Sequence, residues 1–286
     1  ELLFVDKSKD DVTHIAVIFD HKGDTFRKKI YEDYKSNRSE APEDLKIQFD
    51  LIKEATNAFG IEYIELEGFE ADDLIASYCE KAKKLNVNVE IVSSDKDLMQ
   101  LVRPNIVMYD PMKNNYIDRN EVFKKFGVYP EKVIDVQSLS GDKVDNIPGA
   151  PGIGIKTAAQ LINEYGDLES LLLNVSKIKQ PKRRETLIEN SELIRVSKKL
   201  VTLKKDISLP LNFEKLTLKP IDEEKIINFT NKMELKNLKK RIISSLNIDV
   251  EKYKEQNQDI NKNFSNNDKF NKNQKIFSEP YLNYKL

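Results

Sequence analysis

Eight carboxylates lie at four places where one element of secondary structure is expected to end and another to begin. They are Asp20, Glu70, Asp72, Asp73, Asp95, Asp97, Asp142 and Asp145. Carboxylate oxygens select hard cations such as Mg²⁺ or Mn²⁺, and the chain has only one Cys and two His to favour Zn²⁺. Two hard cations roughly 4 Å apart can activate a water and stabilise the leaving oxygen of a phosphodiester. Phosphodiester hydrolysis is therefore the first chemistry that these acids indicate.

Each group of acids also has an ordinary structural interpretation. The helix dipole stabilises acids in a first helical turn, so one or two of the acids that begin at Glu70 need no further function. Asp95 can cap the turn that follows it, and Asp142 suits a polar turn. Three acids within four residues exceed what capping uses, however, because each unneutralised carboxylate adds repulsion. The prediction of a metal site depends on all four groups meeting in one crevice.

A basic segment separates Asp20 from Glu70. Its bases are Lys22, Arg27, Lys28, Lys29, Lys35 and Arg38, with Tyr31 and Tyr34 among them. Aromatic rings stack on nucleobases and cations hold phosphates, so the pentapeptide YKSNR at 34–38 is suited to single-stranded nucleic acid. A solvated helix end is the alternative interpretation.

A Gly- and Pro-rich turn at residues 148–157 leads into a predicted helix. Glycines allow the backbone to approach a ligand closely, and the N–H groups at a helix start bind phosphate without reading sequence. The spacing excludes a Walker loop. A tight turn between helices is the alternative. The candidate phosphate contacts are Gly149, Gly152, Gly154, Lys156 and Thr157.

Short apolar runs that end in acids predict the strands that carry two of the acidic groups. Residues 14–20 and 88–95 are predicted as buried parallel strands, and residues 106–109 as a third. In an α/β fold, parallel strands bring Asp20 and Asp95 to the same edge of the sheet, where ligands bind. Helical spacing is found at 42–58, 69–84, 96–102 and 120–126.

Helical patterns replace strands after residue 128. They cover residues 130–139, 155–165, 168–173, 183–190, 191–200 and 223–233. We therefore predict an α/β core at 1–128, a helical region at 129–246 and a tail at 247–286. The tail has nine Asn, no Gly and no Ala, which is typical of a disordered linker.

Composition excludes several classes of protein. The single Cys79 excludes a disulfide framework and fits a reducing compartment such as the cytosol. No run approaches the roughly 18 apolar residues that a membrane span requires, so we expect no membrane association. The 47 basic and 48 acidic residues argue against a polycation that coats nucleic acid. Local charge runs, such as the six acids within residues 62–73, are also compatible with solvated helix faces.

Together these motifs resemble the 5′ nuclease (5′→3′ exonuclease) domain of bacterial DNA polymerase I, a member of the flap endonuclease family. The matching motifs are FD at 19–20, YKSNR at 34–38, GFEADD at 68–73, SSDKDL at 93–98 and LSGDKVDNIPGAPGIGIKTA at 139–158. The resemblance covers about residues 1–245 in unbroken order. It implies a PIN-like α/β fold with a mainly parallel sheet and flanking helices. A helical arch at about 21–60 and a helix-three-turn-helix motif at about 139–165 are part of that expectation.

The resemblance also implies a function. Such domains are structure-specific 5′→3′ exonucleases and 5′-flap endonucleases that cut branched or 5′-flap duplex DNA with two divalent cations, Mg²⁺ or Mn²⁺. They serve primer removal and repair in the bacterial cytoplasm, in association with the nucleoid, next to a polymerase domain in the same chain. K⁺ at the helix-three-turn-helix motif is a further expectation. Nothing in the sequence indicates an oligomer.

Site roles follow from the resemblance, residue by residue. Asp20, Glu70, Asp72 and Asp73 fall on the family's tighter metal site, Asp95 and Asp97 bridge toward the second site, and Asp142 and Asp145 complete it. The resemblance places Lys35 and Arg38 at the scissile phosphate, with Asp73 and Asp95 as further catalytic residues. It assigns DNA contacts to Arg27, Tyr34, Lys35, Arg38 and the 148–157 turn, and the bases from Lys177 to Arg184 would extend the duplex track.

One feature of the family has no match in the sequence. A further metal-binding Asp is expected on a first strand, in a segment that precedes Glu1. An alternative prediction is therefore a module that binds branched DNA without cutting it, and a second is a PIN-like ribonuclease. The arch and the helix-three-turn-helix motif argue against the ribonuclease.

Overall fold

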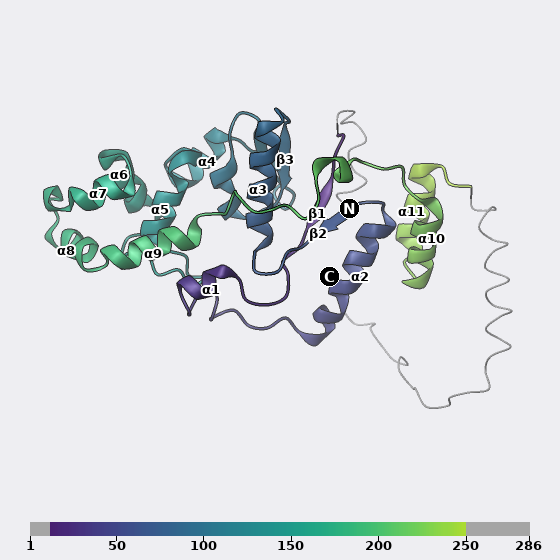
Figure 1. The fold of residues 1–286 in the computed structure, drawn as a ribbon, viewed down its shortest axis with the longest axis horizontal. Coiled ribbons are helices and arrows are strands. Elements are labelled where there is room, and N and C mark those ends of the chain that lie inside the picture. Colours follow the sequence, from purple (N-terminus) through teal and green to yellow (C-terminus); the bar gives the residue numbers. More distant parts are fainter. Residues whose placement is uncertain (1–11, 250–286) are drawn as a thin grey trace. The chain divides into compact units, whose positions relative to one another are not determined.

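The computed structural model describes residues 12–249, which belong to two compact units, one ending at Pro220 and one beginning at Ile221 (Figure 1). In the second unit, helices α10 (Glu223–Lys232) and α11 (Lys236–Leu246) pack on each other. Among residues 12–249, no helix is both long and apolar enough to cross a membrane. Residues 250–286, most of the predicted tail, lie outside the described residues.

The strands are short and mainly parallel. Strand β1 (Ala16–Ile18) pairs in parallel with β2 (Glu62–Ile64), and β3 (Val89–Val92) pairs in parallel with β4 (Ile106–Asp110). Strand β5 (Asn115–Ile117) adds an antiparallel edge to β4. The three predicted strands are confirmed, but β2 and β5 were not predicted. Within residues 12–249 the strands form two sheets, whereas one sheet was expected.

Helix α3 (Ala71–Lys84) joins the two sheets because its two faces enter different hydrophobic clusters. Leu74 and Tyr78 pack in the cluster beside β1 and β2, while Ala76 and Cys79 pack in the large cluster beside β3 and β4. Residues three and four apart share a helix face, so this sequence spacing creates two apolar faces. The first turn of α3 is therefore fixed relative to the carboxyl ends of strands in both sheets.

The segment expected to be a helical arch contains two helices of different length. Helix α1 (Phe26–Ile30) is short, residues 32–37 form turns, and α2 (Glu43–Ala58) matches the predicted helix at 42–58. Helix α1 contacts α9 (Ser191–Val201), which lies close to it in Figure 1. Helix α2 contacts β2, so the turns at 32–37 lie between two helices that each pack on another element.

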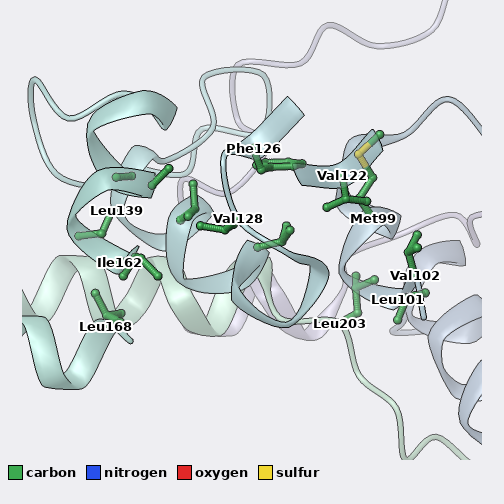
Figure 2. Close-up of a cluster of buried hydrophobic side chains, with 14 of the residues drawn as sticks. Met99, Leu101, Val102, Val122, Phe126, Val128, Leu139, Ile162, Leu168 and Leu203 are labelled. Carbon is green, nitrogen blue, oxygen red and sulfur yellow. The ribbon is translucent and has the colours of Figure 1, made fainter. Parts of the chain in front are cut away.

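The large hydrophobic cluster continues from the strands into the helical region. Figure 2 shows Met99, Val122, Phe126, Leu139 and Ile162 within it, from four different helices. The core is thus continuous across residue 128, where we placed a predicted domain boundary. The elements not yet named in the first unit are η1 (Lys96–Leu101), α4 (Arg119–Phe126), η2 (Pro130–Lys132), α5 (Val133–Ser140), α6 (Ile155–Tyr165), α7 (Leu168–Leu173), η3 (Val175–Lys177), α8 (Pro181–Glu189) and η4 (Phe213–Leu216).

Several predicted helices differ from the observed ones in detail. Residues 96–102, predicted as α-helix, form the 3-10 helix η1, which begins where the Asp95 side chain accepts the N–H of Asp97. The predictions at 155–165 and 168–173 coincide with α6 and α7. Helices α1 and α11 were not predicted.

The loop between α5 and α6 is folded back on itself by two glycines. A Cβ on Gly149 would lie 2.3 Å from the backbone N of Gly141, and both residues have positive φ. Asp142 and Ile147 exchange two backbone hydrogen bonds inside this loop, at 2.9 and 2.7 Å. The close approach of the two glycines therefore sets the position of the residues between them, including Asp142 and Asp145.

Replacement of Gly149 by Ala is expected to lower the free energy of unfolding by about 2–5 kcal/mol, because it adds a backbone clash to the cost of positive φ. Gly152→Ala is the matched control: its φ is +75° but nothing lies within 4 Å of the new Cβ. That variant should lose only about 1–2 kcal/mol. Urea unfolding followed by circular dichroism measures both, and equal losses would contradict the packing argument.

Candidate functional site

A polar cavity lies beside the N-terminus of α3, the ends of β1 and β3, and the turns at 32–37. Six of the eight predicted acids line it, together with Lys35 and Arg38. The six acids are Asp20, Glu70, Asp72, Asp95, Asp97 and Asp145. The structure therefore brings together acids from all four groups. Asp73 and Asp142 are not among the lining residues.

Backbone and side-chain hydrogen bonds position the acids at the strand ends. Asp20 follows β1, and its Oδ1 accepts the N–H of Ala71, the first residue of α3, at 2.7 Å. Asp95 follows β3 and accepts the N–H of Asp97 at 2.8 Å. Asp97 in turn accepts a hydrogen bond from Gln137 Nε2 at 2.5 Å. Strand ends, a helix start and α5 thus all contribute to one site.

The acids are crowded enough to resist full ionisation. Burial, followed by repulsion from Asp95, Asp97, Asp20 and Glu70, raises the pKa of Asp72 to about 8. Burial and the charge of Asp95 raise the pKa of Asp97 to about 6. The cavity therefore carries more negative charge than the neighbouring protein cations neutralise, which is an environment that favours a bound cation.

Four lysine and arginine side chains pair with the predicted acids, and three of these pairs involve Lys35, Arg38 and Lys96. Lys35 Nζ lies 2.8 Å from Glu70 Oε1, and Arg38 Nη2 pairs with Asp145 Oδ1. Lys35 has φ of +56°, a conformation held by its N–H bond to the carbonyl of Asp145 at 2.9 Å. Strain of this kind is often found at functional sites. Asp142 Oδ2 lies 2.5 Å from Lys96 Nζ, outside the cavity lining.

The donor chemistry of the cavity fits hard divalent cations, since every candidate ligand is a carboxylate oxygen. From residue 12 to residue 249, however, no group of three or more His, Cys, Asp or Glu side chains has a ready metal-binding arrangement. Ion pairs with Lys35 and Arg38 occupy oxygens of Glu70 and Asp145. The individual ligands among the cavity acids remain predictions.

Two predicted site residues, Arg27 and Asp73, form a buried ion pair. Arg27 borders the cavity, but its side chain is 1% exposed and that of Asp73 is 0% exposed. Arg27 Nη1 and Nη2 donate to Asp73 Oδ2 and Oδ1 at 2.6 and 2.7 Å, and Arg27 Nε donates to the carbonyl of Leu200. Asp73 also accepts the N–H groups of Glu70 and Lys204. The N–H groups of Arg27 and both oxygens of Asp73 are therefore engaged within the protein, and their roles toward DNA and metal stay predictions.

Tyr34, which is a predicted DNA contact, is 3% exposed. Its hydroxyl donates to Glu70 Oε2 at 3.1 Å and lies 3.5 Å from Asp145 Oδ2. Burial and the charge of Glu70 raise the pKa of Tyr34, which keeps the hydroxyl protonated as a donor. Tyr34 thus holds two cavity acids in place.

The 148–157 turn separates into a buried part and an exposed part. The N–H of Gly149 donates to Ser197 Oγ at 3.0 Å in a buried position, so this N–H already has an acceptor within the protein. Gly152, Gly154 and Lys156 are exposed, and Gly154 precedes the first turn of α6. The first N–H groups of a helix have no acceptor within that helix. This exposed part, with the half-buried Thr157, remains the predicted phosphate site.

Sequence reasoning missed two residues that contact the acids. Lys96 lies between Asp95 and Asp97 in the SSDKDL motif, and this position could have suggested its pairing with a nearby acid. Gln137 lies in an apolar stretch of α5 and carried no signal in the sequence. Only folding brings it to Asp97.

Two family models match the chain in order. The 5′-3′ exonuclease, N-terminal resolvase-like domain matches residues 2–127, and the 5′-3′ exonuclease, C-terminal SAM fold matches residues 128–224. The 5′-3′ exonuclease of Aquifex aeolicus (strain VF5) is 40% identical over 241 residues, which cover 84% of this chain and 82% of that protein. The chain belongs to the 5′-3′ exonuclease family. Membership confirms the predicted fold class and the predicted 5′ nuclease function, a hydrolase activity, and does not favour the non-cutting module.

Other relatives are longer or more distant. DNA polymerase I of Rhizobium leguminosarum is 53% identical over 238 residues, which are 83% of this chain and 23% of that polymerase. The chain thus spans about a quarter of that relative's length. A structure of T5 5′-exonuclease with bound divalent metal ions (zinc) has a TM-score of 0.57 and 25% identity, and the match covers 65% of this chain and 73% of that chain.

Replacement of Arg27 by Met should lower the free energy of unfolding by about 3–5 kcal/mol, because it leaves the Asp73 charge buried without its partner. Arg38→Met is the matched control, because Arg38 is half-exposed and its partner Asp145 keeps Lys35 and Tyr34 nearby, so its loss should cost at most about 1 kcal/mol. Urea unfolding at neutral pH measures both values. Similar losses in the two variants would contradict the structural role of the buried pair.

The raised pKa of Asp72 predicts a pH-dependent stability. Between its ordinary pKa of 3.8 and about 8, the folded state keeps a proton that the unfolded state has lost. The free energy of unfolding should therefore fall as the pH rises through this window, and fall less steeply in Asp72→Asn. Urea unfolding from pH 5 to pH 9 with chelator measures this free energy for both proteins. The same dependence on pH in wild type and Asp72→Asn would contradict the raised pKa of Asp72.

Proposed function

We propose that this chain hydrolyses DNA phosphodiesters in 5′-flap or branched duplexes as a divalent-metal-dependent 5′ nuclease, with Mg²⁺ or Mn²⁺. The observation that carries the proposal is the cavity in which six acids meet and the pKa of Asp72 rises to about 8. A divalent cation is the counter-charge that such a cluster favours. The related T5 5′-exonuclease has divalent metal ions bound, which supports the same chemistry here.

The cavity acids are the proposed ligands. Asp20, Glu70 and Asp72 surround the N-terminus of α3, while Asp95 and Asp97 reach the cavity from the end of β3. Asp145 joins them, and Asp142 is held next to them by Lys96. When bound, divalent cations supply a hydroxide-like nucleophile and neutralise the leaving oxygen. The acids act as ligands rather than nucleophiles, so no covalent enzyme intermediate is part of the proposal.

Lys35 and Arg38 are the proposed contacts of the scissile phosphate. Both side chains border the cavity, with exposed fractions of 22% and 49%, so a phosphate can reach them. The Arg38 guanidinium can hold two phosphate oxygens with its planar fork. Lys35 can offset charge that develops on the phosphate without transferring a proton. When a phosphate binds, Lys35 would leave Glu70 and Arg38 would leave Asp145, and each side chain would pair with the phosphate instead.

The exposed part of the 148–157 turn is the proposed duplex contact. Gly152, Gly154, Lys156 and Thr157 would hold backbone phosphates at the start of α6, where N–H groups and the helix dipole favour anions. K⁺, held by backbone carbonyls of this turn, is the proposed monovalent cation. Bases on α8 and before it would extend this contact along the duplex.

The similarity to DNA polymerase I supports a wider setting. We propose that the chain is the N-terminal nuclease part of such a polymerase and serves primer removal and repair. Its relatives with this name are bacterial, and the proposed location is the bacterial cytoplasm, at the nucleoid.

Asp95→Asn should lower the cleavage rate of a 5′-flap duplex by at least about 100-fold, since removal of one charge-stabilising group at an active site typically has this effect. The assay compares wild type and variant with Mg²⁺, with Mn²⁺ and with chelator, and gel-shift binding in chelator is measured in parallel. Chelator should abolish cleavage, and binding should remain within a few-fold of wild type.

Glu121→Gln is the control, because Glu121 lies on α4, outside the cavity, in a surface pair with Lys124. It should cleave like wild type. Chelator-resistant cleavage, or full activity in Asp95→Asn, would overturn the metal assignment. Tight binding without any cleavage by wild type would instead favour a module that recognises branched DNA.

A further inference from the structure

A buried glutamine from α5 contacts one of the cavity acids. Gln137 is 3% exposed, and its Nε2 donates to Asp97 Oδ1 at 2.5 Å. Asp97 lies 40 residues away in the sequence, in the first turn of η1. The bond therefore crosses from the helical region to the acids that follow β3.

The backbone of Asp97 has its own supports, but its carboxylate depends on this bond. Asp95 Oδ1 accepts the N–H of Asp97, and Gln100 Nε2 donates to the carbonyl of Asp97 at 3.0 Å. Among residues 12–249, Gln137 is the side chain with a hydrogen bond to the Asp97 carboxylate. One carboxylate oxygen is thereby held, and the acid still lines the cavity.

The glutamine is poorly explained as a purely structural residue. Its Oε1 is buried and has no hydrogen-bond partner among the described residues. A buried acceptor without a partner costs stability, and an apolar side chain of similar size would avoid that cost. The neighbours of Gln137 on α5, Val136 and Leu139, are fully buried members of the apolar core. The amide is therefore oriented by Asp97 and not by a second contact.

We propose that Gln137 is a positioning residue that orients the Asp97 carboxylate for a divalent cation. Hydrogen bonds to ligating carboxylates fix their orientation and tune affinity for the metal. Helix α5 leads directly into the loop that carries Asp142 and Asp145. The bond from Gln137 to Asp97 therefore also helps to fix the position of this loop relative to the acids that follow β3. This inference rests on the proposed metal-dependent function.

The test is Mn²⁺ binding to the DNA-free protein, measured by titration calorimetry and by electron paramagnetic resonance. Gln137→Met keeps the length of the side chain and removes the donor, and it should weaken Mn²⁺ binding by about 10–100-fold. Ser138→Ala is the matched control: Ser138 is the next buried polar residue on α5, but its Oγ donates to the carbonyl of Ile134 in the same helix. This control should bind Mn²⁺ like wild type.

A double-mutant cycle separates positioning from a structural role. If Gln137 acts through Asp97, Gln137→Met should have little further effect on Mn²⁺ affinity in an Asp97→Asn background. Equal losses of affinity in both backgrounds would overturn the proposal. Gln137→Leu is made beside Gln137→Met, with circular dichroism as the check of folding. Failure of both variants to fold would also overturn the proposal, because it would make Gln137 structural.

The experiment distinguishes this inference from the function on which it rests. A wild-type protein that binds no Mn²⁺ contradicts the proposed metal-dependent function, and the inference falls with it. Wild-type binding that Gln137→Met leaves unchanged contradicts the inference alone. Wild-type binding that Gln137→Met weakens, with Ser138→Ala unaffected, supports both.

Discussion

The arrangement of the site depends on one buried ion pair between Arg27 and Asp73. A guanidinium removed from water must have its charge and its N–H groups satisfied, and Asp73 with the carbonyl of Leu200 does this. The pair links α1, the first turn of α3 and the end of α9. Because α1 precedes the turns at 32–37, this link also places Tyr34 and Lys35 over the acids.

A second constraint is the repulsion among carboxylates that the fold brings together. Lys35, Arg38 and Lys96 neutralise part of the charge, and their pairs use oxygens that the proposed cations also require. The negative charge that is not neutralised raises the pKa values of Asp72 and Asp97, in addition to the effect of burial. The same charge that costs stability thus creates affinity for divalent cations, which links the stability of the site to its proposed chemistry.

The continuous core explains how distant segments keep a common geometry. Hydrophobic residues from η1, α4, α5 and α6 share one cluster, so the helical region is fixed to the strands (Figure 2). The close approach of Gly141 and Gly149 shapes the loop that carries Asp145. The side chain of Gln137, on α5, donates a hydrogen bond to Asp97. The acids at the strand ends and the acids of the loop can therefore act as one site.

The sequence alone determined the features that local patterns encode. Apolar runs before Asp20 and Asp95 predicted two strands, and helical spacing predicted α6 and α7 to the residue. Strand β2, with the sequence EYI, begins with a charged residue and lacks the apolar run that marked the equally short β1. Burial was decided only by the tertiary structure: Arg27 and Tyr34 are residue types that serve equally well at a DNA surface or inside a hydrogen-bonded core. Which role they take depends on packing against α3 and α9, contacts between segments far apart in the chain that no local spacing records.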